Sequence, residues 1–235
     1  MSVGSVDLNA DLGEEVTDDA GLLLVVTSAN VACGYHAGST GVMRAVCAEA
    51  VRLGVTIGAQ VSYDDRERFG RVELDVSVDV LREQVADQVG TLTAIATAEG
   101  ARVDYLKPHG ALYHRVARDA GQARAVLAGS GDLPVLGMPG SLLLELAAAA
   151  GRDVRHEGFP DRAYTSDGGL VPRSEPGALV TDAGEIARRA VALAARVSSV
   201  CLHGDSPGAV RHATLVRGAL EAARIEVRSC WSSTG

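Results

Sequence analysis

Along this chain, short apolar segments that end in polar or glycine residues alternate with longer stretches of helical periodicity. In the clearest of these stretches, apolar side chains recur every three or four positions: Val78, Leu81, Val85, Val89, Leu92 and Ile95. That spacing puts them on one face of an α-helix, whereas short apolar runs bounded by turn residues are typical of buried strands. The pattern therefore predicts strands that alternate with helices.

Seven segments are predicted as strands: Val6–Asp11, Ser28–Gly34, Thr56–Ser62, Val103–His109, Pro134–Met138, Val154–Phe159 and Ser199–Asp205. Helices are predicted between them and after the last: Val42–Leu53, Val78–Ile95, Ala111–Ala128, Ser141–Ala150, Ala183–Val197 and Pro207–Ala223. Proline is common in a first helical turn, which suits Pro207. Strand and helix thus follow each other in order through the chain.

Repeated β-α-β units of this kind form a parallel sheet, which is either open or closed. Seven units without a change in composition favour a seven-stranded parallel β/α barrel, and the length of 235 residues suits one barrel. We therefore expect a single domain over residues 1–235. A doubly wound open sheet is the structural alternative.

Composition and charge narrow the classes of partner. Hydrophobic residues make up 47% of the chain and aromatic residues only 3%, so Ala, Val and Leu must fill the core. The net charge of −8, without any run of Lys and Arg, argues against nucleic acid or a membrane as partner. The four cysteines are scattered and the N-terminus lacks a signal-peptide pattern, so we expect a cytoplasmic protein.

The first predicted strand carries polar side chains on one face. Asp7, Asn9 and Asp11 are two positions apart, so they share a face, and the apolar residues between them share the other. In a barrel this polar face looks inward, where carboxylates are costly unless they are paired, ligated or hydrated in a site. The alternative is a surface strand with a solvated acidic face.

Three histidines lie at or just beyond the carboxyl ends of predicted strands: His36, His109 and His203. Lys107 shares a strand face with His109, and Asp205 shares one with His203. Active sites of β/α barrels lie at the carboxyl ends of the strands. We therefore expect these side chains to meet at one mouth of the barrel.

The other histidines and the long loop after the sixth strand carry weaker signals. His114 and His212 fall within predicted helices without a partner pattern, so we expect helix-surface residues there. Asp161 and Arg162 begin a loop rich in Gly and Pro, and such loops are often functional, although a plain surface excursion is the alternative. Arg162 or Arg173 could grip a carboxylate through its guanidinium group.

Motifs for nucleotide phosphates and for serine hydrolases are absent from the sequence. There is no GxxxxGK[ST] loop, no GxGxxG turn after a strand and no GxSxG elbow. A standard phosphate cradle is therefore not encoded.

Five motifs occur in a fixed order: DLNADLGE at 7–14, TSANVACGYHAG at 27–38, KPHGALY at 107–113, DRAYTSDGGL at 161–170 and HGDSPGA at 203–209. Together they resemble the family of the 5-oxoprolinase A subunit, also called LamB/YcsF, from Asp7 to about Ala223. The resemblance implies a seven-stranded β/α barrel, in a superfamily that includes polysaccharide deacetylases and some glycosidases.

The resemblance also implies an activity. Members of this family act with two further subunits, B and C, and together they open the cyclic amide of 5-oxo-L-proline to L-glutamate. ATP is hydrolysed to ADP and phosphate in the process, so ATP is a cofactor of the complex. The resemblance does not assign the ATP site to this chain.

The motifs, matched to the strand ends, define an expected site. The residues expected to act in catalysis are Asp11, Lys107, His109 and His203. Those expected to bind substrate are Asp7, Asn9, Glu14, His36, Gln60, Asp161, Arg162 and Asp205. Asp11 or His109 would be the general base. Lys107 would stabilise developing negative charge, and Arg162 would hold the substrate carboxylate.

The chain departs from the family pattern in two places. The connection between Glu14 and Thr27 is shorter than in most members, so we expect a family helix to be trimmed there. Gln60 stands where many members carry histidine, and glutamine forms hydrogen bonds but does not titrate near neutral pH. Either the missing histidine is not the essential proton carrier, or this member has altered chemistry. We expect the first, because Phe69-Gly70-Arg71 and the other motifs are intact.

Two other functions remain as alternatives. A metal-dependent deacetylase or amidohydrolase of another small or carbohydrate substrate would hold a divalent metal through Asp11, His36 and His109, because a carboxylate and two imidazoles form a catalytic metal set. A non-catalytic carrier would bind 5-oxoproline without turnover.

Overall fold

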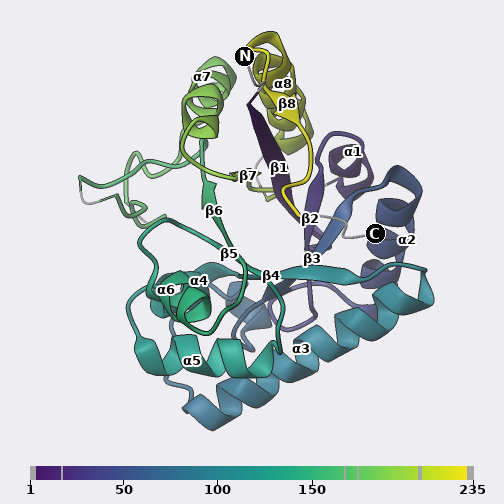
Figure 1. The fold of residues 1–235 in the computed structure, drawn as a ribbon, viewed down its shortest axis with the longest axis vertical. Helices are drawn as coiled ribbons and strands as arrows, with labels where there is room; N and C mark the ends of the chain where they lie inside the picture. The colour runs from purple at the N-terminus through teal and green to yellow at the C-terminus, as the bar shows by residue number, and fades with distance from the viewer. Residues whose placement is uncertain (1–3, 17, 167, 174, 206–207, 232–235) are drawn as a thin grey trace.

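Seven parallel strands close into a barrel that is surrounded by helices (Figure 1). The barrel closes because β1 (Ser5–Leu12) pairs on one side with β2 (Ser28–Ala32) and on the other with β7 (Ser199–Leu202). The seven-stranded parallel barrel expected from the sequence is thereby confirmed. The computed structural model describes residues 4–16, 18–166, 168–173, 175–205 and 208–231.

The strands follow one another around the barrel in chain order. Between β2 and β7 come β3 (Thr56–Val61), β4 (Val103–Pro108), β5 (Val135–Gly137) and β6 (Val154–Gly158). A further short strand, β8 (Glu226–Val227), pairs with the start of β1 outside the ring. The sequence pattern does not predict β8, because two residues carry no periodicity.

The helices lie outside the barrel, as Figure 1 shows. They are α1 (Asp19–Leu23), α2 (Thr40–Leu53), α3 (Val78–Ala98), α4 (Gly110–Val116), α5 (Ala120–Gly129), α6 (Leu142–Ala149), α7 (Ala183–Ala194) and α8 (Ala209–Ala222), with a 3-10 turn at Arg66–Arg68. The short helix α1 occupies the connection between Glu14 and Thr27. In the part of the chain that the structure describes, no helix is long and apolar enough to span a bilayer.

One predicted helix is wrong as a single element. The segment Ala111–Ala128 forms two helices, α4 and α5, rather than one. Asp119 separates them, because its carboxylate accepts hydrogen bonds from the backbone N–H groups of Gly121 and Gln122 and so caps α5. Pro207, expected in the first turn of the last helix, lies outside the described residues.

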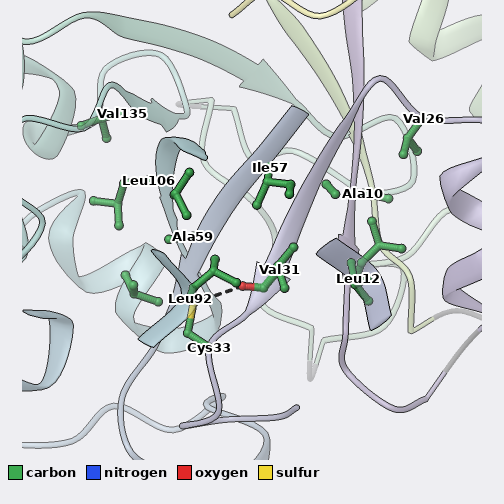
Figure 2. Close-up of a cluster of buried hydrophobic side chains, with 14 of the residues drawn as sticks. Ala10, Leu12, Val26, Val31, Cys33, Ile57, Ala59, Leu92, Leu106 and Val135 are labelled. Carbon is green, nitrogen blue, oxygen red and sulfur yellow. Dashed lines mark hydrogen bonds between the residues drawn. The ribbon is translucent and has the colours of Figure 1, made fainter. Parts of the chain in front are cut away.

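Apolar side chains on the outer face of the strands form the core between barrel and helices. Figure 2 shows Ala10 and Leu12 of β1 in one buried cluster with Val31, Ile57 and Leu92. Aliphatic side chains dominate this cluster, as the low aromatic content requires. The apolar residues of β1 therefore turn toward the helices, and its polar residues turn into the barrel.

Close packing inside the barrel leads to a prediction about stability. Gly58 of β3 pairs with Tyr105 of β4, and a Cβ atom at position 58 would overlap the buried Tyr105 ring. We expect Gly58→Ala to lower the free energy of unfolding by roughly 1–3 kcal/mol, the usual cost of overpacking. Urea denaturation measures this value.

The control is Gly90→Ala on the exposed surface of α3, where an added Cβ meets open space. It should raise the free energy of unfolding by roughly 0.5–1 kcal/mol, because alanine favours a helix over glycine. Equal effects of the two substitutions would contradict the packing at Gly58.

Candidate active site

A cavity of about 460 Å³ opens at the carboxyl ends of the barrel strands. Asp11 comes to it from β1, Lys107 from β4, and His203 from the residues that follow β7. His109, directly after β4, also lines the cavity. The structure thus brings together the four residues expected to act in catalysis, at the end of the barrel where such enzymes hold their sites.

The Lys107 ammonium group lies at the centre of a buried cluster of polar side chains. Its Nζ atom lies 3.0 Å from Asp11 Oδ1, 3.2 Å from Glu157 Oε2 and 3.0 Å from Cys201 Sγ. Burial by itself would raise the pKa of Asp11, but the nearby ammonium holds that pKa well below its usual range. Burial would lower the pKa of Lys107, and Asp11 raises it well above normal. The pair is therefore charged at neutral pH.

Glu157 contacts Lys107 in this cluster, and the sequence reasoning missed it. It lies on β6 with its side chain turned inward, and burial raises its pKa, with the Lys107 ammonium opposing that shift. Asp11 and Glu157 share one ammonium group, and their pKa values are driven in opposite directions. Such a pair can hold one charged and one protonated carboxyl group. The period-two position of Glu157 before Phe159 was the available signal.

A second buried cluster surrounds His109. The rings of His36 and His109 stack with centroids 4.0 Å apart. Gln60 Nε2 lies 3.0 Å from Glu14 Oε1 and 2.9 Å from His109 Nδ1. The other nitrogen of His109 lies 3.2 Å from the carbonyl oxygen of Phe69, and burial lowers the pKa of His109 well below normal. Both ring nitrogens of His109 therefore already have partners.

Within this cluster, Glu14, His36 and His109 each offer a ligand atom, all within 4.8 Å of one another. Both nitrogens of His36 are buried without a hydrogen-bond partner among the described residues. The sequence predicted Asp11, His36 and His109 as the alternative metal ligands. In the structure Glu14, not Asp11, lies with the two histidines, and Asp11 is paired with Lys107.

His203 is oriented by Asp161. Its Nδ1 atom and its backbone nitrogen lie 2.9 Å and 3.1 Å from Asp161 Oδ2. The His203 ring also packs on Phe159, with centroids 5.4 Å apart. Burial would raise the pKa of Asp161, but His203 lowers it, so the carboxylate is charged. With Nδ1 donating to Asp161, Nε2 remains as an acceptor at the cavity.

Arginine side chains form the rim of the cavity. Arg162 donates from Nη2 to the carbonyl of Val171 at 2.7 Å and from Nε to that of Ala178 at 3.4 Å, which ties down the loop. Arg173 Nη1 lies 3.0 Å from Asp205 Oδ2, and Arg71 pairs with the same oxygen. Asp205 thus links two of the arginines that line the cavity.

Other expected residues lie elsewhere. Asp7 and Asn9 are fully buried and do not line the cavity: Asp7 accepts from Ser28 at 2.6 Å, and Asn9 donates to Ser199 at 2.6 Å. His114, expected on a helix surface, instead lines the cavity, because α4 begins immediately after β4 and carries it over the mouth.

Known proteins resemble this chain over almost its full length. The A subunit of 5-oxoprolinase from Streptomyces coelicolor is 54% identical, with 94% of this chain and 98% of that protein covered. The protein of the same name from Mycobacterium avium is 48% identical, with 97% and 99% covered.

Solved structures agree with the barrel. The lactam utilization protein from Thermus thermophilus superposes with a TM-score of 0.89 at 38% identity, over 95% of this chain and 99% of that one. A family 4 carbohydrate esterase from Streptomyces lividans in complex with acetate shares only the fold, with a TM-score of 0.52 at 10% identity over 95% and 91%. Residues 6–234 match the LamB/YcsF family. This chain therefore belongs to the LamB/YcsF family.

Proposed function

We propose that this chain is the A subunit of an ATP-dependent 5-oxoprolinase, a hydrolase that opens the cyclic amide of 5-oxo-L-proline to L-glutamate. The observation that carries the proposal is the cavity, in which a Lys107–Asp11 ion pair and a His203–Asp161 pair face one space. An oriented imidazole can act as a general base in the hydrolysis of an amide, and an ammonium group can stabilise the negative charge that develops on the carbonyl oxygen. The names of the close relatives support the choice of substrate.

The charge of the cavity supports an anionic substrate. Lys107, Arg71, Arg162 and Arg173 line it. Lys107 is paired with Asp11, and Arg71 and Arg173 share Asp205, whereas Arg162 contacts backbone carbonyl groups and has no carboxylate partner among the described residues. A guanidinium group without a carboxylate partner attracts anions, and 5-oxoproline carries a carboxylate. Arg162 would hold that carboxylate through Nη1, because its Nε and Nη2 atoms already donate to backbone carbonyl groups.

The chemistry assigns one role to each group. Water attacks the lactam carbonyl carbon while His203 Nε2 accepts its proton, and Asp161 stabilises the imidazolium that forms. The Lys107 ammonium stabilises the negative charge that develops on the carbonyl oxygen. The ring C–N bond then breaks, and the nitrogen takes up the proton that His203 accepted from water, which leaves the amino group of glutamate and a neutral His203. His203 thus takes the role of base for which the sequence offered Asp11 or His109.

The use of ATP is assigned to the whole complex. Two partner subunits, B and C, would complete the enzyme, and hydrolysis of ATP to ADP and phosphate there would supply the activation of the lactam carbonyl group. The close relatives are named as one subunit of 5-oxoprolinase, which supports a multi-subunit enzyme. We assign the complex to the cytoplasm, which the four free cysteines support.

A second candidate is a metal-dependent amidohydrolase of another small or carbohydrate substrate. The observation that favours it is the cluster of Glu14, His36 and His109, a carboxylate with two imidazoles. The unpartnered nitrogens of His36 fit a metal, which would supply a Lewis acid. The Gln60 amide, however, already bridges Glu14 and His109 by hydrogen bonds. This bridge favours the first function.

The first test is reconstitution. We expect glutamate to form only when this chain, both partner subunits, ATP and 5-oxoproline are all present, because the sequence contains no standard phosphate cradle. Glutamate is measured by a coupled assay and ADP in parallel. Hydrolysis of ATP by the purified chain alone would contradict the assignment of ATP use to the complete complex. Binding of 5-oxoproline without turnover in the full mixture would instead favour the carrier.

The second test separates His203 from His109. His203→Gln should slow glutamate formation by roughly 100-fold to 10,000-fold, the usual contribution of a general base. Its melting temperature should change little, since the side chain lies at the cavity mouth. The control is His156→Gln, an exposed position on β6 away from the cavity. A larger loss of turnover in His109→Gln, at equal stability, would return the role of base to His109.

The third test is elemental analysis of the protein purified without chelators. We expect a substoichiometric content of divalent metal, because Gln60 bridges two of the three ligand residues. His36→Ala serves as the comparison, since it removes one of the three residues that could bind the metal. One metal ion per chain that disappears in His36→Ala would favour the amidohydrolase.

A further inference from the structure

Asp11 depends on a second donor besides Lys107, namely the amide of Asn30. Asn30 is its partner across the β1–β2 ladder, and Asn30 Nδ2 lies 2.9 Å from Asp11 Oδ1. This is the same oxygen that lies 3.0 Å from Lys107 Nζ. Asn30 is fully buried, so water does not replace its contact. The orientation of the Asp11 carboxylate therefore rests on both donors.

The amide of Asn30 belongs to a row of hydrogen bonds inside the barrel. Its Nδ2 also donates to Asn9 Oδ1 at 2.7 Å, and Asn9 Nδ2 donates to Ser199 Oγ at 2.6 Å. Ser199 in turn donates to the carboxylate of Asp7, which only accepts. Each donor in the row meets an acceptor, so the row has one consistent direction.

Tyr105 of β4 fixes the orientation of the Asn30 amide. Its hydroxyl group donates to Asn30 Oδ1 at 2.6 Å, which keeps the NH2 group turned to Asp11. Without that hydroxyl, the Asn30 carbonyl would be a buried acceptor that lacks a partner. A flipped amide would set its carbonyl oxygen against the negatively charged Asp11.

The Tyr105 ring is itself held in place by the C-terminal segment. Trp231, which follows β8, stacks on it with ring centroids 4.4 Å apart and an interplanar angle of 7°. Gly58 lies against the ring, where any larger residue would overlap it. A residue near the end of the chain thus contacts the group that orients the Asn30 amide.

We propose that Tyr105, supported by Trp231, is a positioning residue for the reaction, because it holds Asp11 and Lys107 in place through Asn30. This inference rests on the proposed function, which assigns Asp11 and Lys107 to the lactam-opening site. Tyr105 does not line the cavity, so it reaches the reacting groups only through Asn30. Its loss affects turnover rather than the affinity for substrate, which the rim arginines supply.

The test is Tyr105→Phe in the complete mixture of subunits, ATP and 5-oxoproline. The change removes the hydroxyl and keeps the ring and its stack. We expect kcat to fall roughly 10-fold to 100-fold, the effect of misplacing a group in an active site, with KM for 5-oxoproline unchanged. Trp231→Phe should retain more turnover than Trp231→Ala, because a phenyl ring still stacks on Tyr105.

The matched control is Tyr63→Phe, which removes another buried tyrosine hydroxyl, 3.2 Å from Gln122 on α5. It should lower the melting temperature about as much as Tyr105→Phe does while leaving kcat unchanged. An unchanged kcat in Tyr105→Phe, or an equal loss in Tyr63→Phe, would overturn the inference.

A wild-type mixture that forms no glutamate would overturn the proposed function instead. The neutron crystal structure of Tyr105→Phe, which locates the hydrogen atoms of the Asn30 amide, tests the inference in either case. A displaced or flipped Asn30 amide supports it, and an Asn30 amide that still donates to Asp11 as in the wild type overturns it.

Discussion

The interior of this barrel depends on one buried ammonium group, that of Lys107. It lies between the carboxyl groups of Asp11 and Glu157, and all three side chains are almost excluded from solvent. A buried ion pair is tolerated only where the remaining polar atoms also find partners, because desolvation of the charges is costly. The inner face of the barrel supplies the Asn30 amide to Asp11 and the Cys201 sulfur to Lys107, so the polar interior is organised around Lys107.

This constraint explains why the strands have two unlike faces. On β1, Leu8 and Ala10 pack among the aliphatic side chains under the helices, while Asn9 and Asp11 turn into the barrel. The main hydrophobic core (Figure 2) therefore lies between the strands and the helices, and a smaller cluster of Tyr105, Leu136 and Trp231 packs separately from it. The side chains inside the barrel are closely packed, and Gly58 has no space for a side chain beside Tyr105.

The candidate site could be predicted in outline. Histidines and a lysine at strand ends indicated one mouth, because parallel strands of a barrel end on the same side. Their separation into two groups could not be predicted: His109 joins His36, while His203 joins Asp161. Glu157 escaped notice because the strand Val154–Gly158 carries polar residues on both faces, which hides its alternation. Which of these side chains meet depends on the conformation of loops and on neighbouring strands, and the spacing of residues along one strand does not determine it.

The sequence by itself determined the order of strands and helices, the inward column of Asp7, Asn9 and Asp11, and the family. These are local properties, since the alternation of side chains along a strand and the order of motifs are written in neighbouring positions. Only the tertiary structure decided that β1 closes the barrel against β7 and that Lys107 meets Asp11 across 96 positions of chain. The physical reason is that ion pairs and hydrogen bonds depend on distances between side chains of different strands, and those distances exist only once the barrel has closed.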